Sequence, residues 1–160
     1  MMFPFTKIGS FRVETPGPAE GHIDALEVAL LDWLIRQRPR DIARVPHSMA
    51  FKAGVLRFAS GWNILWPIGS GEIALAAAAG GIEVSYRLRL TELFVVTILV
   101  VILLLGQISV LKDIPITSDV IAGLAVLWFA LFGGNYLIAP LRLSGALKEV
   151  ARQATGGTIV

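Results

Sequence analysis

The chain has 160 residues, of which 55% are hydrophobic and 16% charged, and its mean hydropathy is +0.71. A soluble domain usually has about 45–50% apolar and about 25% charged residues, so this composition indicates a membrane protein with room for one small additional domain. The lack of cysteine excludes disulfides, thiolate metal sites and cysteine nucleophiles, and a formal net charge of +2 is too small to indicate nucleic-acid binding.

The first 37 residues predict a strand, a turn and an amphipathic helix. Residues 5–13 suit a short strand, and the Thr-Pro-Gly-Pro sequence at 15–18 is typical of a turn. Residues 21–37 repeat their apolar side chains at helical spacing, which predicts a helix whose apolar stripe faces a core. The residues of this stripe are Ile23, Leu26, Leu30, Trp33 and Leu34.

The same helix carries a second apolar strip on its other side. It consists of Val28, Leu31 and Ile35 and lies among charged residues. One interpretation is that the helix is covered twice, by its own sheet and by a partner or a membrane surface. The other is that the helix of a small domain exposes a few apolar side chains, which is common.

Four arginines lie within nine residues at the end of this helix. They are Arg36, Arg38, Arg40 and Arg44. Such a cluster suits contact with an anionic surface, either lipid head groups or an acidic partner. The simpler interpretation, favoured by Asp41 among them, is that they complement the negative end of the helix dipole and are otherwise solvated.

In the next part of the chain the apolar period changes to two, as in a half-buried strand. The pattern predicts strands near 49–58, 72–79 and 82–90, and the last two flank Gly80-Gly81, a favoured hairpin turn. Residues 1–90 are therefore expected to form a small cytoplasmic α+β domain, one amphipathic helix with a mainly antiparallel sheet. No linker separates its last strand from the next apolar run, so the sheet should lie against the membrane.

Two tryptophans, Trp62 and Trp66, lie in the apolar segment between the first two of these strands. If exposed, they form a contact surface for a membrane or partner, because indoles favour headgroup interfaces and the cores of protein interfaces. Alternatively, the segment folds over the small sheet. The Gly-Ser-Gly-Glu sequence at 69–72 begins like a phosphate-binding turn, but it leads into a strand rather than a helix N-terminus, so we discard that assignment.

The second half of the chain predicts a transmembrane helical hairpin. The 19 residues 93–111 carry no charge and cover roughly 28 Å as a helix, close to the ~30 Å hydrocarbon core of a bilayer. A second uncharged run follows at 120–141, and Pro140 is expected to end it. The spans are placed at about 92–111 and 118–139, and the short connection makes the two helices antiparallel neighbours.

Basic residues near the ends of the spans indicate the topology. Those outside the hairpin are Arg87, Arg89, Arg142, Lys148 and Arg152, whereas the connection contains Lys112 beside Asp113. This bias predicts a two-pass protein of the cell inner membrane, with a hairpin at residues 91–140 and both termini in the cytoplasm. Residues 141–160 are expected to form a short amphipathic cytoplasmic tail along the leaflet.

The second span carries the residues best suited to contacts within the membrane. They are Trp128, Phe129, Phe132, Gly133, Gly134 and Asn135. The aromatic rings suit packing against another transmembrane helix, a pigment, a quinone or a lipid tail, and plain lipid exposure explains them as well. The glycines are small enough for close helix approach, and the asparagine can bond a neighbouring helix or an interfacial water.

The sequence contains no recognisable catalytic or metal-binding pattern. Both His22 and His47 suit capping or surface roles, and no metalloprotease, nucleophile-elbow, P-loop or dinucleotide-loop motif occurs. The spans also lack the ionisable residues that an ion path requires. We therefore expect no enzyme activity, no cofactor and no nucleic-acid partner.

Three functional hypotheses follow. The first is a non-catalytic accessory or structural subunit of a larger inner-membrane complex, respiratory, photosynthetic or transport, whose partners are other membrane-protein subunits and the lipid bilayer. The second is a membrane-surface sensor of lipid or ligand that uses the arginines and the tryptophan segment. The third is a homo-oligomeric pore formed by the hairpin.

Overall fold

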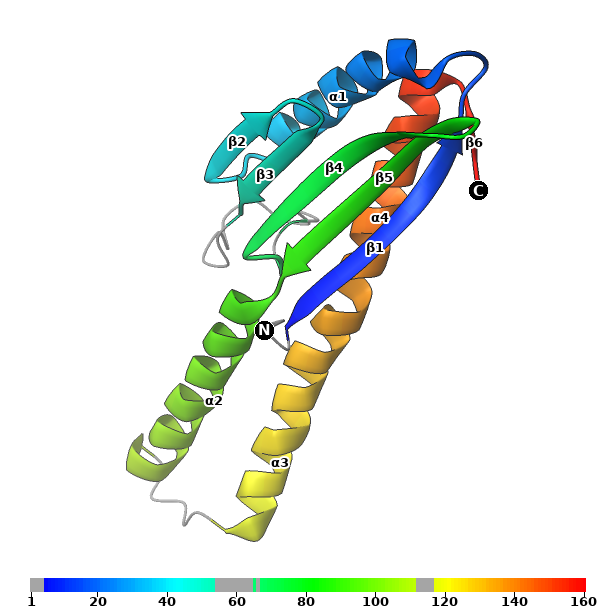
Figure 1. Cartoon of the computed structure of the whole chain (residues 1–160). Helices are drawn as coiled ribbons and strands as arrows, with labels where there is room; N and C mark the ends of the chain where they lie inside the picture. Colours follow the sequence, from blue (N-terminus) through cyan, green and yellow to red (C-terminus); the bar gives the residue numbers. More distant parts are fainter. Residues whose placement is uncertain (1–4, 54–64, 66, 112–116) are drawn as a thin grey trace.

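A computed structural model describes residues 5–53, 65, 67–111 and 117–160 (Figure 1). It contains a six-stranded antiparallel sheet, two helices packed on one face of that sheet, and a helical hairpin that extends from one end. The strands are β1 (Thr6–Glu14), β2 (Asp41–Val45), β3 (Ser48–Lys52), β4 (Ser70–Ala78), β5 (Gly81–Arg89) and β6 (Thr158–Ile159). The helical elements are α1 (Ala19–Arg36), α2 (Thr91–Leu111), α3 (Ser118–Trp128), the π-helical segment η1 (Phe129–Gly133) and α4 (Gly134–Thr155).

The sheet brings the two ends of the chain together. Its strand order is β2-β3-β4-β5-β1-β6, and all neighbouring strands are antiparallel. β1 pairs with β5 over its full length, from Thr6 opposite Arg89 to Glu14 opposite Gly81. β6 adds the C-terminal end of the chain to the far end of β1. The prediction of an α+β fold with an antiparallel sheet is confirmed.

Most of the predicted elements are present near their expected bounds. The helix expected at 21–37 is α1, and the strands expected at 72–79 and 82–90 are β4 and β5, joined by a turn in which Gly80 has a φ of +83°. The strand expected at 49–58 corresponds to β3 up to residue 52, and its remainder from residue 54 lies outside the described residues. Strand β2 was not predicted, because four of its five side chains are exposed and no apolar alternation marks it.

The hydrophobic core lies between the sheet and the pair formed by α1 and α4. All five residues of the predicted apolar stripe of α1 are buried there, and Leu26, Leu30 and Leu34 are fully covered. Every second residue of the central strands faces these helices, including Ile73 on β4 and Val84 on β5. The alternating pattern that predicted the strands therefore also identified the side of the sheet that the helices cover.

The second helix of the hairpin does not end at Pro140, so that prediction is wrong. Residues Ser118–Thr155 form one continuous run of 38 helical residues through α3, η1 and α4, with Pro140 inside α4. A proline in a helix interior costs about 3 kcal/mol. Burial of Leu143 and Leu147, each worth about 1.5–3 kcal/mol, offsets that cost.

Residues 141–155 are amphipathic and helical, as expected, but their apolar face packs on the domain instead of lying along a membrane leaflet. Leu143, Leu147 and Ala151 are fully buried in the core against α1 and β1. The helix ends at Gly156, whose left-handed conformation (φ +62°) lets its N–H bond the Arg152 carbonyl. The C-terminal residues are therefore part of the α+β domain.

Two helices of the chain, by length and composition, are long and apolar enough to cross a membrane. They are Thr91–Ile108 within α2, and the continuous helix Ser118–Thr155. Only 11% and 6% of their most apolar windows are buried inside the chain, whereas the core helix of a soluble protein would be mostly covered. Both enter the domain without a linker: Leu90 and Leu93 are buried at the junction with β5, and α4 continues along the sheet.

Candidate functional site

The face of the sheet opposite α1 and α4 is not covered by any helix in the described part of the chain (Figure 1). The side chains on this open face are mainly small or charged, because they alternate with the core residues of each strand. Its small residues include Ala43, Ala50, Ala74 and Ala76, and its charged residues include Asp41, Lys52, Glu72, Arg87 and Arg89. This mixture leaves the surface shallow between long polar side chains.

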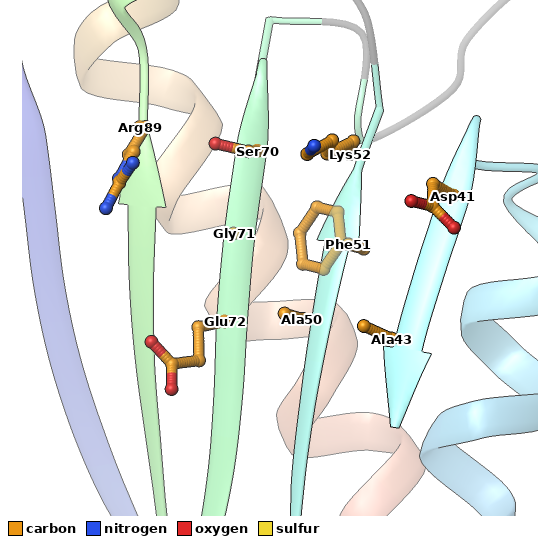
Figure 2. A pocket seen from close by; sticks show the side chains of 9 residues that line it. All are labelled: Asp41, Ala43, Ala50, Phe51, Lys52, Ser70, Gly71, Glu72 and Arg89. Carbon is orange, nitrogen blue, oxygen red and sulfur yellow. The ribbon is translucent and has the colours of Figure 1, made fainter. Parts of the chain in front are cut away.

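A pocket of about 220 Å³ lies on the open face at the end nearest the hairpin (Figure 2). Strand pairing places Asp41, Lys52, Ser70 and Arg89 opposite one another in a single row across β2, β3, β4 and β5. In Figure 2 the ammonium end of Lys52 is turned toward β4 and the Ser70 hydroxyl toward β5. Since neighbouring strands are about 4.8 Å apart, the backbones of Lys52 and Arg89 lie about 10 Å apart with Ser70 between them.

The pocket continues one row farther from the hairpin, to Glu72. Its carboxylate is turned toward β5 on the same face (Figure 2). The floor of the pocket is low because Ala43 and Ala50 carry only methyl groups. A Cβ at Gly71 would clash on the inner face with the Phe51 ring, so the core itself requires glycine there.

The charged side chains of the pocket are not paired with one another. Within the described part of the chain, Asp41, Lys52, Glu72 and Arg89 form no ion pair, and their formal charges sum to zero. The structure thus presents two cations and two carboxylates, uncompensated by close contacts, around one hydroxyl group. Such a site is suited to a small polar ligand bearing both signs of charge.

A second polar cluster joins the β2–β3 hairpin to α1. The Glu27 side chain is only 5% exposed, and its Oε1 accepts a hydrogen bond from Arg44 Nε at 2.7 Å. Its Oε2 accepts a bond from the His47 backbone N–H at 3.3 Å and lies 3.6 Å from His47 Nδ1. The hydrogen bond from Arg44 is the main cause that lowers the pKa of Glu27, against burial, which raises it.

Asp24, Glu27 and His47 are the one group of His, Asp and Glu side chains among the described residues whose ligand atoms lie close enough together to hold a metal ion. Arg44 already places a positive charge 2.7 Å from the central carboxylate. A metal ion there would meet that charge and would have to displace the arginine from Glu27. We therefore interpret the cluster as an ion pair that fixes the hairpin to the helix.

The four arginines predicted as an anionic-surface contact do not act alike. Arg44 pairs with Glu27, and Arg36 pairs with Asp32 at 2.9 Å on the exposed side of α1. Arg38, in a left-handed conformation (φ 50°), and Arg40 are exposed and form no ion pair with another described residue. Two of the four guanidiniums are thus engaged within the domain.

An aromatic cluster joins the hairpin to the domain. The Phe94 ring of α2 lies 4.3 Å from Phe5, 5.4 Å from Phe132 and 5.8 Å from Trp128, measured between ring centroids. Trp128 and Phe132 stack at 5.1 Å. Two of the predicted contact residues therefore pack within the chain, whereas Phe129 on η1 is 67% exposed at the edge of the cluster, where its ring meets Trp128 edge to face at 5.1 Å.

The polar and small residues beside this cluster are also accounted for locally. Asn135 Nδ2 donates to the Leu131 carbonyl at 2.7 Å, so its bond lies within its own helix rather than to a neighbouring one. Among the described residues, a Cβ on Gly133 or Gly134 would meet nothing within 4 Å, so neither glycine serves a close helix approach there. The Trp128 Nε1 is buried without a hydrogen-bond acceptor in the described residues.

An apolar groove of about 340 Å³ separates the two helices of the hairpin farther from the domain. Trp128 closes the end of the groove nearest the domain. The aliphatic side chains that line the groove include Ile98, Ile102, Leu105, Ile121 and Leu124. The Trp128 Nε1 is fully enclosed, so this donor does not open into the groove. Trp62 and Trp66, the other predicted contact residues, lie outside the described residues.

The chain matches no protein-family model, no curated protein and no solved structure. Its function has to be inferred from its own residues. Sequence reasoning missed the pocket because Lys52, Ser70 and Arg89 are 37 residues apart from first to last, and only strand register places them in one row. The only sequence signal for the pocket was that charged and polar residues occupy the exposed positions of the alternating strands.

Proposed function

We propose that this protein is a non-catalytic, membrane-anchored accessory subunit that holds a rigid α+β domain against the cytoplasmic surface of a larger inner-membrane complex. The observation that carries the proposal is the double connection between domain and hairpin. β5 enters α2 directly, and one helix runs from Ser118 in the hairpin to Thr155 at the far end of the sheet. Two direct connections of this kind fix the orientation of the domain relative to the hairpin.

Two surfaces support a partner-binding role. The outer face of the hairpin exposes large apolar side chains, including Leu103 (67%) and Phe129 (67%). On the domain, Val28 and Ile35 of the second apolar strip of α1 remain 60% and 54% exposed. Lipid explains the first surface, but the second belongs to the domain and is suited to another protein.

The orientation rests on the distribution of basic residues. Arg87 and Arg89 precede α2, and Arg142 follows the apolar part of the second helix, all on the domain side. The positive-inside rule then places the domain and both termini in the cytoplasm. A cysteine introduced at Arg12, on the open face, should be labelled by a membrane-impermeant thiol reagent in inside-out vesicles and not in intact cells.

The partner experiment uses the full chain in its native membrane. A photo-crosslinking residue at Val28 should give one defined product in mild detergent, and Ile35→Lys should abolish it. The same crosslinker at Arg12, an exposed polar position on the open face of the sheet, is the control and should give none. A chain that migrates as a stable monomer and crosslinks to nothing from Val28 would refute the proposal.

The pore and the arginine-based sensor have less support. An ion path requires ionisable or polar groups along the hairpin, and residues 93–111 and 120–141 contain no charge. A sensor that binds through the arginine cluster would use Arg36 and Arg44, which are engaged in ion pairs. If the protein reconstituted in bilayers conducts no ions, that result would count against the pore.

A further inference from the structure

The charged residues of the open-face pocket lie in two successive rows, counted from the hairpin end of the sheet. Lys52, Ser70 and Arg89 form the row at the end of the sheet, and Arg89 is only two residues before the start of α2. Glu72 lies two residues along β4, which is about 7 Å farther from the hairpin. A ligand that enters from the membrane side meets two cations and a hydroxyl first, with the Asp41 carboxylate at the β2 end of this row, and the Glu72 carboxylate second.

Phosphate is the group best matched to the first row. Lysine and arginine bind phosphate oxygens, and a hydroxyl between them supplies one further hydrogen bond. The two cationic residues lie on opposite sides of Ser70, because β4 separates their strands; the Lys52 ammonium is turned toward β4, and the Arg89 side chain has to turn from the β1 side to reach the same phosphate (Figure 2). Beside this row Ala50 carries only a methyl group, which leaves space for the phosphate above β3.

A primary ammonium is the group best matched to the second row. The Glu72 carboxylate accepts hydrogen bonds and carries the opposite charge, and it makes no ion pair with another described residue. Arg87, directly opposite on β5, is its competitor on the same face. Asp41 lies at the β2 end of the first row, opposite Lys52, and forms no ion pair with that lysine.

We propose that this pocket binds a phospholipid headgroup that carries both a phosphate and a primary ammonium. The phosphate lies at Lys52, Ser70 and Arg89, and the ammonium lies at Glu72. In such a lipid the phosphate is attached on the acyl-chain side and a two-carbon linker leads outward to the ammonium, which is the same order as the charges of the pocket. A volume of about 220 Å³ suits a headgroup rather than a whole drug-sized ligand.

The balance of charge distinguishes this ligand from an anionic lipid. Two cations and two carboxylates give the lining no net charge, whereas a site for an anionic headgroup would carry an excess of arginine and lysine. The proposal rests on the membrane anchoring proposed above, since the hairpin sets the direction from which the headgroup enters. It does not require the protein partner.

The test uses the full chain reconstituted in vesicles of phosphatidylcholine that contain equal minor fractions of phosphatidylethanolamine and phosphatidylglycerol. After extraction in mild detergent, the lipids that stay bound are quantified by mass spectrometry. Phosphatidylethanolamine should be enriched about tenfold over both others, the equivalent of one charge-assisted hydrogen bond. Phosphatidylcholine is the sharpest comparison, because its quaternary ammonium has no N–H to donate to Glu72.

Variants of each row test the two halves of the site separately. Lys52→Gln combined with Arg89→Gln should abolish the enrichment, and Glu72→Gln should remove the preference for phosphatidylethanolamine over phosphatidylglycerol. Arg12→Gln, on the open face at the far end of the sheet, is the matched control and should behave as the wild type. If the double variant does not fold, Ala50→Leu fills the floor without changing any charge and should also abolish enrichment.

A soluble arm distinguishes a lipid from a free ligand. Glycerophosphoethanolamine, the headgroup without acyl chains, is titrated against the same protein while its thermal unfolding is followed. Stabilisation by this probe without lipid enrichment would overturn the lipid source of the ligand. Equal retention of all three lipids, preference for phosphatidylglycerol, or enrichment that survives the double variant would overturn the site. Partner crosslinking from Val28 reports on the proposed function separately, because that position is on α1.

Discussion

Replacing Arg44 by methionine is expected to destabilise the domain more than replacing its partner Glu27 by glutamine. The Glu27 side chain is 5% exposed, so without Arg44 it remains a buried carboxylate with one backbone N–H as partner. That change should cost about 2–4 kcal/mol. The Arg44 side chain is 54% exposed and is hydrated when its partner is neutral, so Glu27→Gln should cost only about 1–2 kcal/mol.

The same pair makes a definite contribution to the pH dependence of stability. The pKa of Glu27 is lowered in the folded state, chiefly by the Arg44 hydrogen bond, from an ordinary value of 4.5. The folded state therefore favours the ionised form, and the resulting stabilisation is complete above the unfolded-state pKa. It is lost as the pH falls through the lowered folded-state pKa. The difference in stability between wild type and Arg44→Met should shrink below pH 4.5 for this reason.

Thermal unfolding in an uncharged detergent, followed by tryptophan fluorescence, measures both effects, since Trp33 is buried on the same helix as Glu27. A loss of 1 kcal/mol should lower Tm by roughly 2–4 °C for a chain of this size. Arg36→Met is the matched control: its ion pair with Asp32 is exposed at both ends, and the change should cost less than about 0.5 kcal/mol. Equal effects of Arg44→Met and Arg36→Met, or a difference that is constant down to acid pH, would refute the reasoning.

Three further predictions concern packing and backbone. Phe132→Ala should destabilise by about 3–5 kcal/mol because Phe132 is buried in the aromatic cluster, whereas Phe129→Ala, on the same π-helical segment but exposed, should have little effect on Tm in detergent. Leu147→Ala should cost about 2–5 kcal/mol and Leu141→Ala almost nothing, as judged by urea unfolding of the domain; similar values would mean that α4 does not pack on the sheet. Gly81→Ala should lower Tm, since its Cβ would clash with the Val13 carbonyl. Gly145→Ala, in open space on α4, should raise Tm, because alanine favours a helix by about 1 kcal/mol over glycine. A stable Gly81→Ala variant would show that β1 and β5 separate there without cost.

The aromatic residues illustrate how far a pattern in one helix can be interpreted. Trp128, Phe129 and Phe132 were grouped because they are close in sequence and bulky. Their periodicity does not tell which of them meets Phe5 and Phe94, because those rings arrive from the far end of the chain and from the other helix of the hairpin. The π-helical turn at 129–133 also changes the direction in which side chains point, and no residue pattern marks it.

The ion pair of Glu27 was not visible in the sequence pattern. Glu27 lies four residues after Ile23 and three before Leu30, at the edge of the apolar stripe of α1, and its partners are Arg44 on β2 and the His47 backbone N–H. β2 itself gives no strand signal, since it is an edge strand whose residues are mostly exposed. The partner of this buried carboxylate therefore belongs to a strand that the sequence pattern does not predict.

Local and compositional features determined the α+β class, the apolar stripe of α1, the alternation of β4 and β5 and the two apolar helices. These depend on spacings of two to four residues and on long uncharged runs, which the sequence displays directly. Strand register, the continuation of α4 past Pro140 and the row of Lys52, Ser70 and Arg89 were decided only by the tertiary structure. The reason is that each depends on contacts between segments far apart in the chain, where burial free energy outweighs local preference.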